Sequence, residues 1–212
     1  MIKRLIFDVD DTLIPWKDEY WYSLNETLIY FDIEPKEELV NKLKEAVDNY
    51  ELEYNTYNMK TMKEAMEKYS GIKLPGNFVY RWTILLRKCV PDNYDFKLID
   101  TLEYLRDKYD LVVLTNWFTV QQAQRLKKIG ILKYFTKVYG TDNMLNKPNK
   151  EAFIETCKPY KPSECIFIGD SYEVDIKGAI NTGLKAIYLN NKKEKKDNCI
   201  IINSLYELKD LL

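Results

Sequence analysis

The first residues able to do chemistry lie close to the start of the chain, in the stretch KRLIFDVDDTLIPW at residues 3–16. An apolar run leads there into three carboxylates within four residues, Asp8, Asp10 and Asp11. Adjacent carboxylates repel one another and resist leaving water, so a buried group of this kind needs positive charge nearby. The sequence therefore predicts either a solvated turn or a site that receives a cation.

Polar residues of complementary chemistry accompany two later apolar runs. Thr115 and Asn116 end the run YDLVVLTN, and Asp170 ends the run ECIFIGD, with Asp175 five residues further on. Lys147 precedes a proline between these two points. Each residue alone is also an ordinary turn former, helix cap or surface lysine. Because ligands bind beyond the carboxyl ends of the strands in open parallel sheets, the residues together predict one shared site.

The elements that must position these residues alternate between strand and helix. Apolar runs predict strands at residues 2–9, 109–115, 137–140, 164–170, 185–189 and 199–202. Helices are expected at residues 96–108 and 120–128, after Pro148, at residues 174–182 and at the end of the chain. This alternation predicts an α/β fold, a doubly wound, Rossmann-like parallel sheet.

A helical block interrupts this sheet after its first strand. Between residues 15 and 93, apolar residues recur at helical spacing, as in Leu39, Leu43 and Val47. We therefore expect two domains, an α/β core at residues 1–14 and 94–212 and an inserted all-helical domain at residues 15–93.

Composition excludes several classes of protein. The chain has no histidine, which rules out imidazole bases, histidine metal ligands and Ser-His-Asp triads. Its 32 Lys+Arg nearly cancel its 33 Asp+Glu, and the basic run at 191–197 contains acids and no aromatics, so we expect no nucleic-acid partner. The four cysteines lack the spacing of a metal site, which favours a reduced, cytoplasmic protein. The sequence has no apolar run of membrane-spanning length, so we expect no membrane partner.

At the polar residues that follow its apolar runs, the chain resembles the haloacid dehalogenase-like hydrolase superfamily, in particular its phosphatase-type members with a helical cap. FDVDDTL is similar to the first motif of that family, a hydrophobic residue followed by DxDxT-L. VVLTN resembles the second motif, NKPNKEAF the third and IGDSYEVDIKGA the fourth. The four motifs run from Phe7 to Ala179, and the helical block has the position of that family's cap insertion.

The resemblance implies a magnesium-dependent phosphatase that hydrolyses a small phosphorylated metabolite through an aspartyl-phosphate. Asp8 would be the nucleophile, since a carboxylate with an ordinary pKa of about 3.9 is ionised without help from a base. A carboxylate oxygen of Asp8, the backbone carbonyl of Asp10 and a carboxylate oxygen of Asp170 would hold Mg²⁺, with Asp175 behind them.

Within the family, Asp10 is the residue that indicates which type of reaction is catalysed. Phosphatases and phosphomutases need an acid there to protonate the leaving oxygen and then to activate water, whereas dehalogenase-like members do not. We expect Asp10 in that role and Asp11 as a solvated turn residue. Lys147, the Thr115 hydroxyl and the backbone N–H of Asn116 are expected to bind phosphate oxygens.

Several alternatives stay open from the sequence. A sugar phosphomutase shares this chemistry and differs in excluding water, and a phosphonate hydrolase would want a cap lysine that we cannot assign. A non-catalytic binding domain on this fold would have no need for the full set of residues. The substrate, and the choice between monomer and homodimer, are left open. Trp16, Tyr20 and Trp21 are candidates for the inner face of the cap, with core packing as the default interpretation.

Overall fold

The structure, a computed structural model, describes residues 1–93, 95–190, 196 and 198–212. The chain forms two compact units, Met1–Pro15 with Val90–Leu212, and Trp16–Cys89. The first unit carries the sheet and the second is helical. The basic run at 191–197 lies, apart from Lys196, outside the described residues, so its interpretation stays a prediction.

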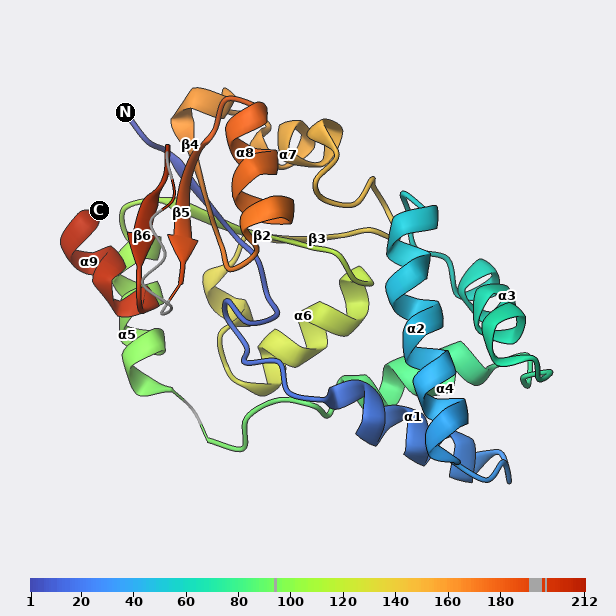
Figure 1. The fold of residues 1–212 in the computed structure, drawn as a ribbon. Helices are drawn as coiled ribbons and strands as arrows, with labels where there is room; N and C mark the ends of the chain where they lie inside the picture. The colour runs from blue at the N-terminus through green and yellow to red at the C-terminus, as the bar shows by residue number, and fades with distance from the viewer. Residues whose placement is uncertain (94, 191–195, 197) are drawn as a thin grey trace. The chain divides into compact units, whose positions relative to one another are not determined.

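A parallel sheet forms the centre of the first unit (Figure 1). Among the described residues it has six strands in the order β3-β2-β1-β4-β5-β6, and every neighbouring pair is parallel. Each strand lies within a predicted apolar run, although β1 is shorter than the range 2–9. The predicted doubly wound α/β fold is thus confirmed. The strands are β1 (Arg4–Phe7), β2 (Asp110–Thr115), β3 (Lys137–Gly140), β4 (Cys165–Gly169), β5 (Lys185–Leu189) and β6 (Ile200–Ile202).

Both faces of the sheet are buried, because successive side chains of each strand point into opposite cores. Leu5 and Phe7 belong to one core and Ile6, between them, to the other. Figure 1 shows α7 and α8 on one side of the sheet and α5 and α9 on the other. The helices of this unit are α5 (Phe96–Arg106), α6 (Thr119–Lys128), α7 (Lys150–Cys157), α8 (Lys177–Asn181) and α9 (Leu208–Leu211).

One expected helix is built differently from the prediction. The pattern predicts a single helix over residues 174–182, whereas the structure has a wide π-type turn at Tyr172–Ile176 followed by the short α8. The carbonyl oxygen of Ser171 accepts from the N–H groups of both Asp175 and Ile176, at 2.9 and 3.2 Å. Such wide turns are frequent at functional sites. Here the turn contains Asp175, which is buried.

The second unit is a small group of helices, as the apolar spacing predicts. The residues that recur at helical spacing are largely buried, among them Leu43, Val47, Met62, Met66 and Trp82. No helix in the described parts of the chain combines the length and the apolarity that a membrane span needs. The helices are α1 (Glu19–Tyr30), α2 (Glu37–Glu53), α3 (Met59–Ser70) and α4 (Phe78–Leu86).

Aromatic residues hold part of this helical unit together. Nε1 of Trp82 donates to Oγ of Ser23 at 2.8 Å, which joins α4 to α1. The ring of Tyr20 lies 5.8 Å from that of Trp82 and 5.2 Å from that of Trp16. Tyr20 therefore packs within its own unit. That this unit serves as a cap stays a prediction.

A buried ion pair stabilises the amino-terminal end of the sheet. Arg4, at the start of β1, donates from Nε and Nη2 to one oxygen of Asp110 at 3.0 and 2.5 Å. Its Nη1 donates to the carbonyl oxygens of Thr156 and Lys158 at 2.6 and 2.5 Å. The Arg4 side chain is only 7% exposed, so these partners are largely shielded from water. Arg4 thereby links β1 to β2 and to the end of α7.

Arg4→Met should destabilise the protein by about 3 kcal/mol, because it leaves the Asp110 carboxylate and two carbonyl oxygens without their buried donor. Lys3→Met is the matched control, since Lys3 pairs with Glu164 at 2.7 Å but is half exposed and screened by solvent. Urea unfolding followed by circular dichroism measures both midpoints. Equal shifts for the two variants would contradict the importance assigned to the buried pair.

Candidate active site

Polar residues that follow three strands meet at one edge of the sheet. β1 lies between β2 and β4, and all three strands run in the same direction. The pairing extends one residue past β1, because the N–H of Asp8 donates to the carbonyl oxygen of Ile168 at 2.9 Å. Asp8, Asn116 and Asp170 therefore leave neighbouring strands at the same edge.

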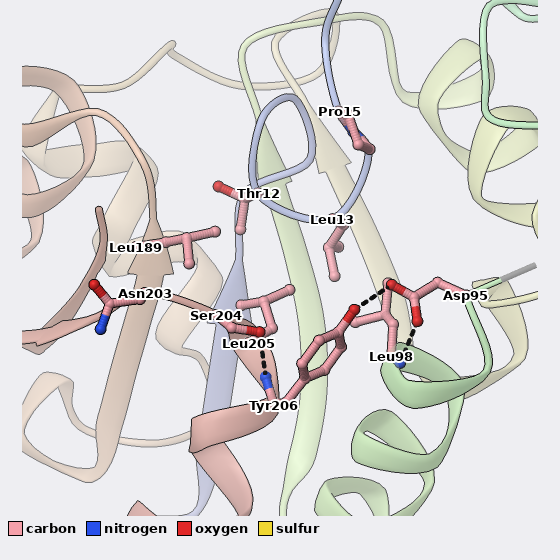
Figure 2. A pocket seen from close by; sticks show the side chains of 10 residues that line it. All are labelled: Thr12, Leu13, Pro15, Asp95, Leu98, Leu189, Asn203, Ser204, Leu205 and Tyr206. Carbon is pink, nitrogen blue, oxygen red and sulfur yellow. Dashed lines mark hydrogen bonds between the residues drawn. The ribbon is translucent and has the colours of Figure 1, made fainter. Parts of the chain in front are cut away.

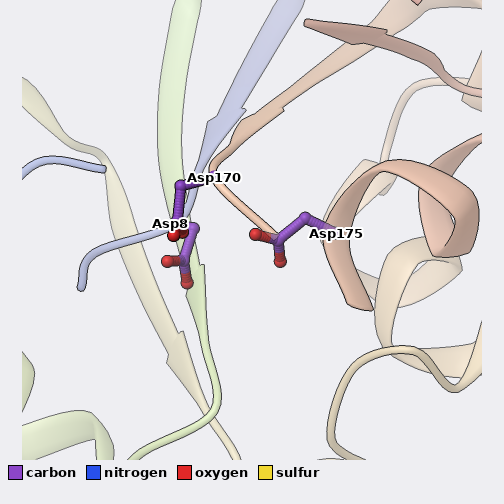
Figure 3. A group of neighbouring side chains, drawn as sticks. All are labelled: Asp8, Asp170 and Asp175. Atoms are coloured by element: carbon purple, nitrogen blue, oxygen red, sulfur yellow. The ribbon is translucent and has the colours of Figure 1, made fainter. Parts of the chain in front are cut away.

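Three carboxylates converge at this edge (Figure 3). Oxygen atoms of Asp8, Asp170 and Asp175 lie within 4.8 Å of one another. Lys147 enters from the loop before α7, and its Nζ lies 2.5 Å from an oxygen of Asp8 and 2.6 Å from an oxygen of Asp175. The side chains of Lys147 and Asp175 are at most 3% exposed, so their attraction is weakly screened by solvent. These contacts make a buried lysine bridge two of the acids.

Burial and the neighbouring charges together shift the pKa values of this cluster. It raises the pKa of Asp8 well above its ordinary range, against the opposing effect of Lys147, and the charge of Asp175 raises it further. Burial likewise raises the pKa of Asp170 to about 6, and the charge of Asp175 adds to the effect. Burial alone would lower the pKa of Lys147, but the charges of Asp175 and Asp8 outweigh it and raise it. The ordinary pKa expected for Asp8 from sequence therefore does not apply, and its ionised form needs further positive charge.

The loop from which Lys147 extends is held by the side chain of Asn116. Nδ2 of Asn116 donates to the carbonyl oxygen of Lys147 at 2.9 Å, and the N–H of Lys147 donates to Oδ1 of Asn116 at 2.7 Å. The sequence predicts a role for the backbone N–H of Asn116 on a phosphate, and that role stays a prediction. The structure adds a task for its side chain, which fixes the position of the lysine backbone.

Glycine at position 169 makes room for Asp175. A Cβ atom on Gly169 would overlap the Asp175 carboxylate. The N–H of Ser171 donates to Oδ2 of the same carboxylate at 3.1 Å. Gly169 therefore does more than end a strand, because any side chain there would displace the acid that holds Lys147.

Asp10 and Thr115 are joined through two residues that the sequence analysis misses, Gln122 and Arg125. Asp10 accepts from Nε2 of Gln122 at 2.7 Å and from Nη1 of Arg125. Nε2 of Gln122 also donates to Oγ of Thr115 at 3.0 Å. A signal for these residues is present in the sequence of α6, which has few apolar residues for a helix that packs on a sheet. Its buried face must then be polar and must find polar partners inside the protein.

Asp11 and Thr12, the next two residues of the chain, lie in the turn after Asp10. Asp11 is exposed and has a φ of 55°, in the left-handed region that turns use, and its N–H donates to the carbonyl oxygen of Ile14 at 2.8 Å. Thr12 is buried, and its hydroxyl donates to Asp170 at 3.3 Å. Thr12 thus orients one carboxylate of the cluster, a role that the sequence analysis does not assign.

The charges of this site fit a divalent cation. The four carboxylates of Asp8, Asp10, Asp170 and Asp175 carry four negative charges when ionised, and Lys147 and Arg125 contribute two positive ones. Two negative charges are left, which is the amount that one divalent cation balances. Carboxylate oxygens are also the ligands that Mg²⁺ prefers in proteins.

A hollow of about 190 Å³ lies beside the turn (Figure 2). Thr12 and Leu13 line it together with Asp95 and Tyr206, whose hydroxyl donates to the Asp95 carboxylate at 2.6 Å. Asp95 is the one charged side chain among the ten residues that line the hollow. None of the predicted site residues is among them, but Thr12, whose hydroxyl donates to Asp170, connects the hollow to the carboxylate cluster.

Known proteins resemble this chain in sequence and in fold. The family of haloacid dehalogenase-like hydrolases matches residues 2–183. A glyceraldehyde 3-phosphate phosphatase from Methanothermobacter thermautotrophicus is 27% identical over 100% of both chains. An N-acylneuraminate-9-phosphatase from Rattus norvegicus is 26% identical, over 90% of this chain and 83% of the relative. The HAD-hydrolase YfnB from Bacillus subtilis, solved bound to magnesium, has the same fold, with a TM-score of 0.78 and 22% identity over 100% of this chain and 98% of that one.

Asp170→Asn should weaken Mg²⁺ binding by about tenfold or more, because it removes a charged oxygen from the cluster. Asp107→Asn is the control, since Asp107 is exposed and precedes β2, at the opposite end of that strand from the site. Isothermal titration calorimetry with magnesium chloride measures both variants. An unchanged Mg²⁺ affinity in Asp170→Asn would contradict the cation site.

Proposed function

The chain belongs to the haloacid dehalogenase-like hydrolase family, and from this premise we propose that it is a Mg²⁺-dependent phosphatase that hydrolyses a small phosphorylated metabolite through an aspartyl-phosphate on Asp8. The phosphatase names of its curated relatives support this class of reaction. The observation that carries the proposal is the contact of Lys147 with Asp8 inside the carboxylate cluster. This arrangement suits the attack of an anionic nucleophile on an anionic phosphate.

Mg²⁺ would be held by carboxylate oxygens of Asp8 and Asp170 and by the backbone carbonyl of Asp10. When bound, the ion would neutralise phosphate charge and orient the phosphoryl group. Asp175 already has both oxygens engaged by protein donors, one of them Nζ of Lys147. We therefore assign Asp175 to holding the lysine and not to the ion.

In the first step, an oxygen of Asp8 bonds to phosphorus while the bond from phosphorus to the leaving oxygen breaks. Lys147 keeps a positive charge beside the attacking carboxylate. The Thr115 hydroxyl accepts from Gln122, so its own hydrogen points elsewhere and can be donated to a phosphate oxygen. Asp10 gives a proton to the leaving oxygen, which departs as an alcohol.

In the second step, Asp10 takes a proton from water as the water oxygen attacks phosphorus. The bond from phosphorus to Asp8 breaks, inorganic phosphate leaves, and Asp8 returns to its carboxylate form. Asp10 is protonated again and ready for another cycle. The backbone N–H of Asn116 would donate to a phosphate oxygen in both steps.

A sugar phosphomutase is the second candidate, because it would use the same aspartyl-phosphate and differ only in excluding water. A non-catalytic domain is less well supported. Burying Lys147 between two acids costs free energy, and a domain without chemistry would gain nothing from it. The helical unit Trp16–Cys89 would select the substrate, the task that the family gives to a cap. The two curated relatives compared above are named for different substrates, so the panel of the test has to be broad.

Phosphate release from triose, sugar and nucleoside phosphates, measured with and without Mg²⁺, tests the proposal. We expect release in the presence of Mg²⁺, its loss after EDTA treatment, and its recovery when Mg²⁺ is added back. Full activity after exhaustive removal of the metal would refute metal dependence. Conversion between sugar phosphate isomers without phosphate release, followed by phosphorus NMR, would favour the mutase.

Two variants of the first stretch separate the roles of its acids. Asp8→Asn keeps the size of the side chain and removes the nucleophile, so turnover should fall to background. Asp10→Asn keeps the nucleophile and the backbone carbonyl and removes proton transfer, which contributes about 100- to 10,000-fold. With a sugar phosphate the loss should lie near the top of that range, because an alkoxide is a poor leaving group.

An activated aryl phosphate sharpens this comparison, because its leaving group needs little protonation. Asp10→Asn should then give a rapid burst of phenolate and slow turnover, since no base remains to activate water against the aspartyl-phosphate. Asp8→Asn should give no burst. Stopped-flow absorbance and acid-quench trapping of the phosphoenzyme measure these outcomes. If neither variant shows a burst or trapped phosphoenzyme, the division of labour between Asp8 and Asp10 is wrong.

A further inference from the structure

Helix α6 presents a buried polar face to the proposed acid. Gln122 has no exposed surface and Arg125 is 2% exposed, and the two lie one turn apart on the same face of the helix. Removing a guanidinium and an amide from water is costly unless their polar atoms find partners. The partner that both share is Asp10, whose side chain is 34% exposed and so still reaches solvent. An apolar residue could fill the interior without this cost, so the contact with Asp10 needs its own explanation.

The contacts between these three side chains form a closed ring. Nη1 of Arg125 donates to one oxygen of Asp10 and, at 2.9 Å, to Oε1 of Gln122. Nε2 of Gln122 donates to the other oxygen of Asp10 at 2.7 Å. Each carboxylate oxygen of Asp10 therefore receives a donor from α6. The side chain of Asp10 cannot rotate without breaking both hydrogen bonds.

We propose that Gln122 and Arg125 are positioning residues for Asp10, an inference that rests on the proposed function. An acid proton and an N–H donor cannot occupy the same lone pair of an oxygen, so the two donors leave the other side of the carboxyl group for the proton. The proton that Asp10 transfers then points away from α6. Proton transfer requires the leaving oxygen within hydrogen-bond reach, and a misplacement of about 1 Å costs about 100-fold in rate.

Gln122 has a second task, at the hydroxyl of Thr115. Its Nε2 also donates to Oγ of Thr115 at 3.0 Å, and Thr115 is buried. This contact directs the hydrogen of the hydroxyl away from the helix. Gln122 thus orients the acid and a phosphate-binding group together, and it couples the first and second motifs through one side chain.

The first test compares leaving groups. Arg125→Met should slow the first step about 100-fold with an alkyl phosphate, because Asp10 is no longer held in place. With an activated aryl phosphate the burst rate should change by less than about threefold, since that leaving group needs little protonation. Arg125→Lys restores a cation and should recover part of the alkyl rate. Lys127→Met removes a charge from the exposed side of the same helix and should change neither rate.

A double-mutant cycle then separates positioning from structural support. If Arg125 acts through Asp10, adding Arg125→Met to Asp10→Asn should slow the alkyl phosphate no further. A structural role predicts that the two losses multiply. Rapid-quench measurement of the first step gives all four rates. Multiplying losses, or equal slowing of the aryl and alkyl first steps, would overturn the inference.

Gln122→Met provides an independent variant if Arg125→Met fails to fold. It should show the same preference for aryl over alkyl phosphate. In addition, inhibition by inorganic phosphate should be about fivefold weaker, because Thr115 loses its orienting partner. Unchanged inhibition would exclude the second task of Gln122. A wild-type chain without phosphatase activity would overturn the proposed function and this inference together. If the wild type is active but the Gln122 and Arg125 variants lose the same factor in rate with alkyl and with aryl phosphate, the inference alone is overturned.

Discussion

Buried negative charge at one edge of the sheet is the constraint on which the rest of the core unit depends. Asp8 and Asp175 are almost entirely buried, and burial raises the pKa of Asp8 well above its ordinary range. A fold that brings these acids together must also bring cations to them. Lys147 contacts two of the acids and Arg125 contacts Asp10, and the side chains of both cations are buried. The negative charge that is still unbalanced is the amount that one divalent cation would neutralise.

Local features at the strand ends bring the acids and the lysine together. The parallel sheet places the ends of β1, β2 and β4 side by side. A glycine at 169 and the wide turn at Tyr172–Ile176 let the acid of the fourth motif approach the strand end closely enough to hold the lysine. Asn116 fixes the loop of that lysine from the neighbouring strand end. Side chains of the second and fourth motifs thereby hold the lysine of the third motif, so the position of this lysine depends on all three motifs.

Helix α6 shows how an element can serve packing and chemistry at once. Leu126 joins the core beneath the sheet, while Gln122 and Arg125 face the proposed acid from the same helix. Because the helix follows directly after β2, it starts at the site and its first turns lie close to Thr115. A helix placed there can orient the acid and the phosphate-binding hydroxyl with rigid geometry, which a loop would not provide.

The sequence by itself determined the parallel α/β architecture, the helical insertion and the polar residues proposed for the site. Apolar runs and the residues at their ends are local features, and the chemistry of carboxylates, a lysine and a threonine can be read from their types. Only the tertiary structure decided which side chains touch. Arg125 and Asp10 are 115 residues apart in the chain, and their contact depends on how α6 packs against the sheet. The raised pKa of Asp8 also belongs to the folded protein alone, because burial is a property of the whole core and of no single motif.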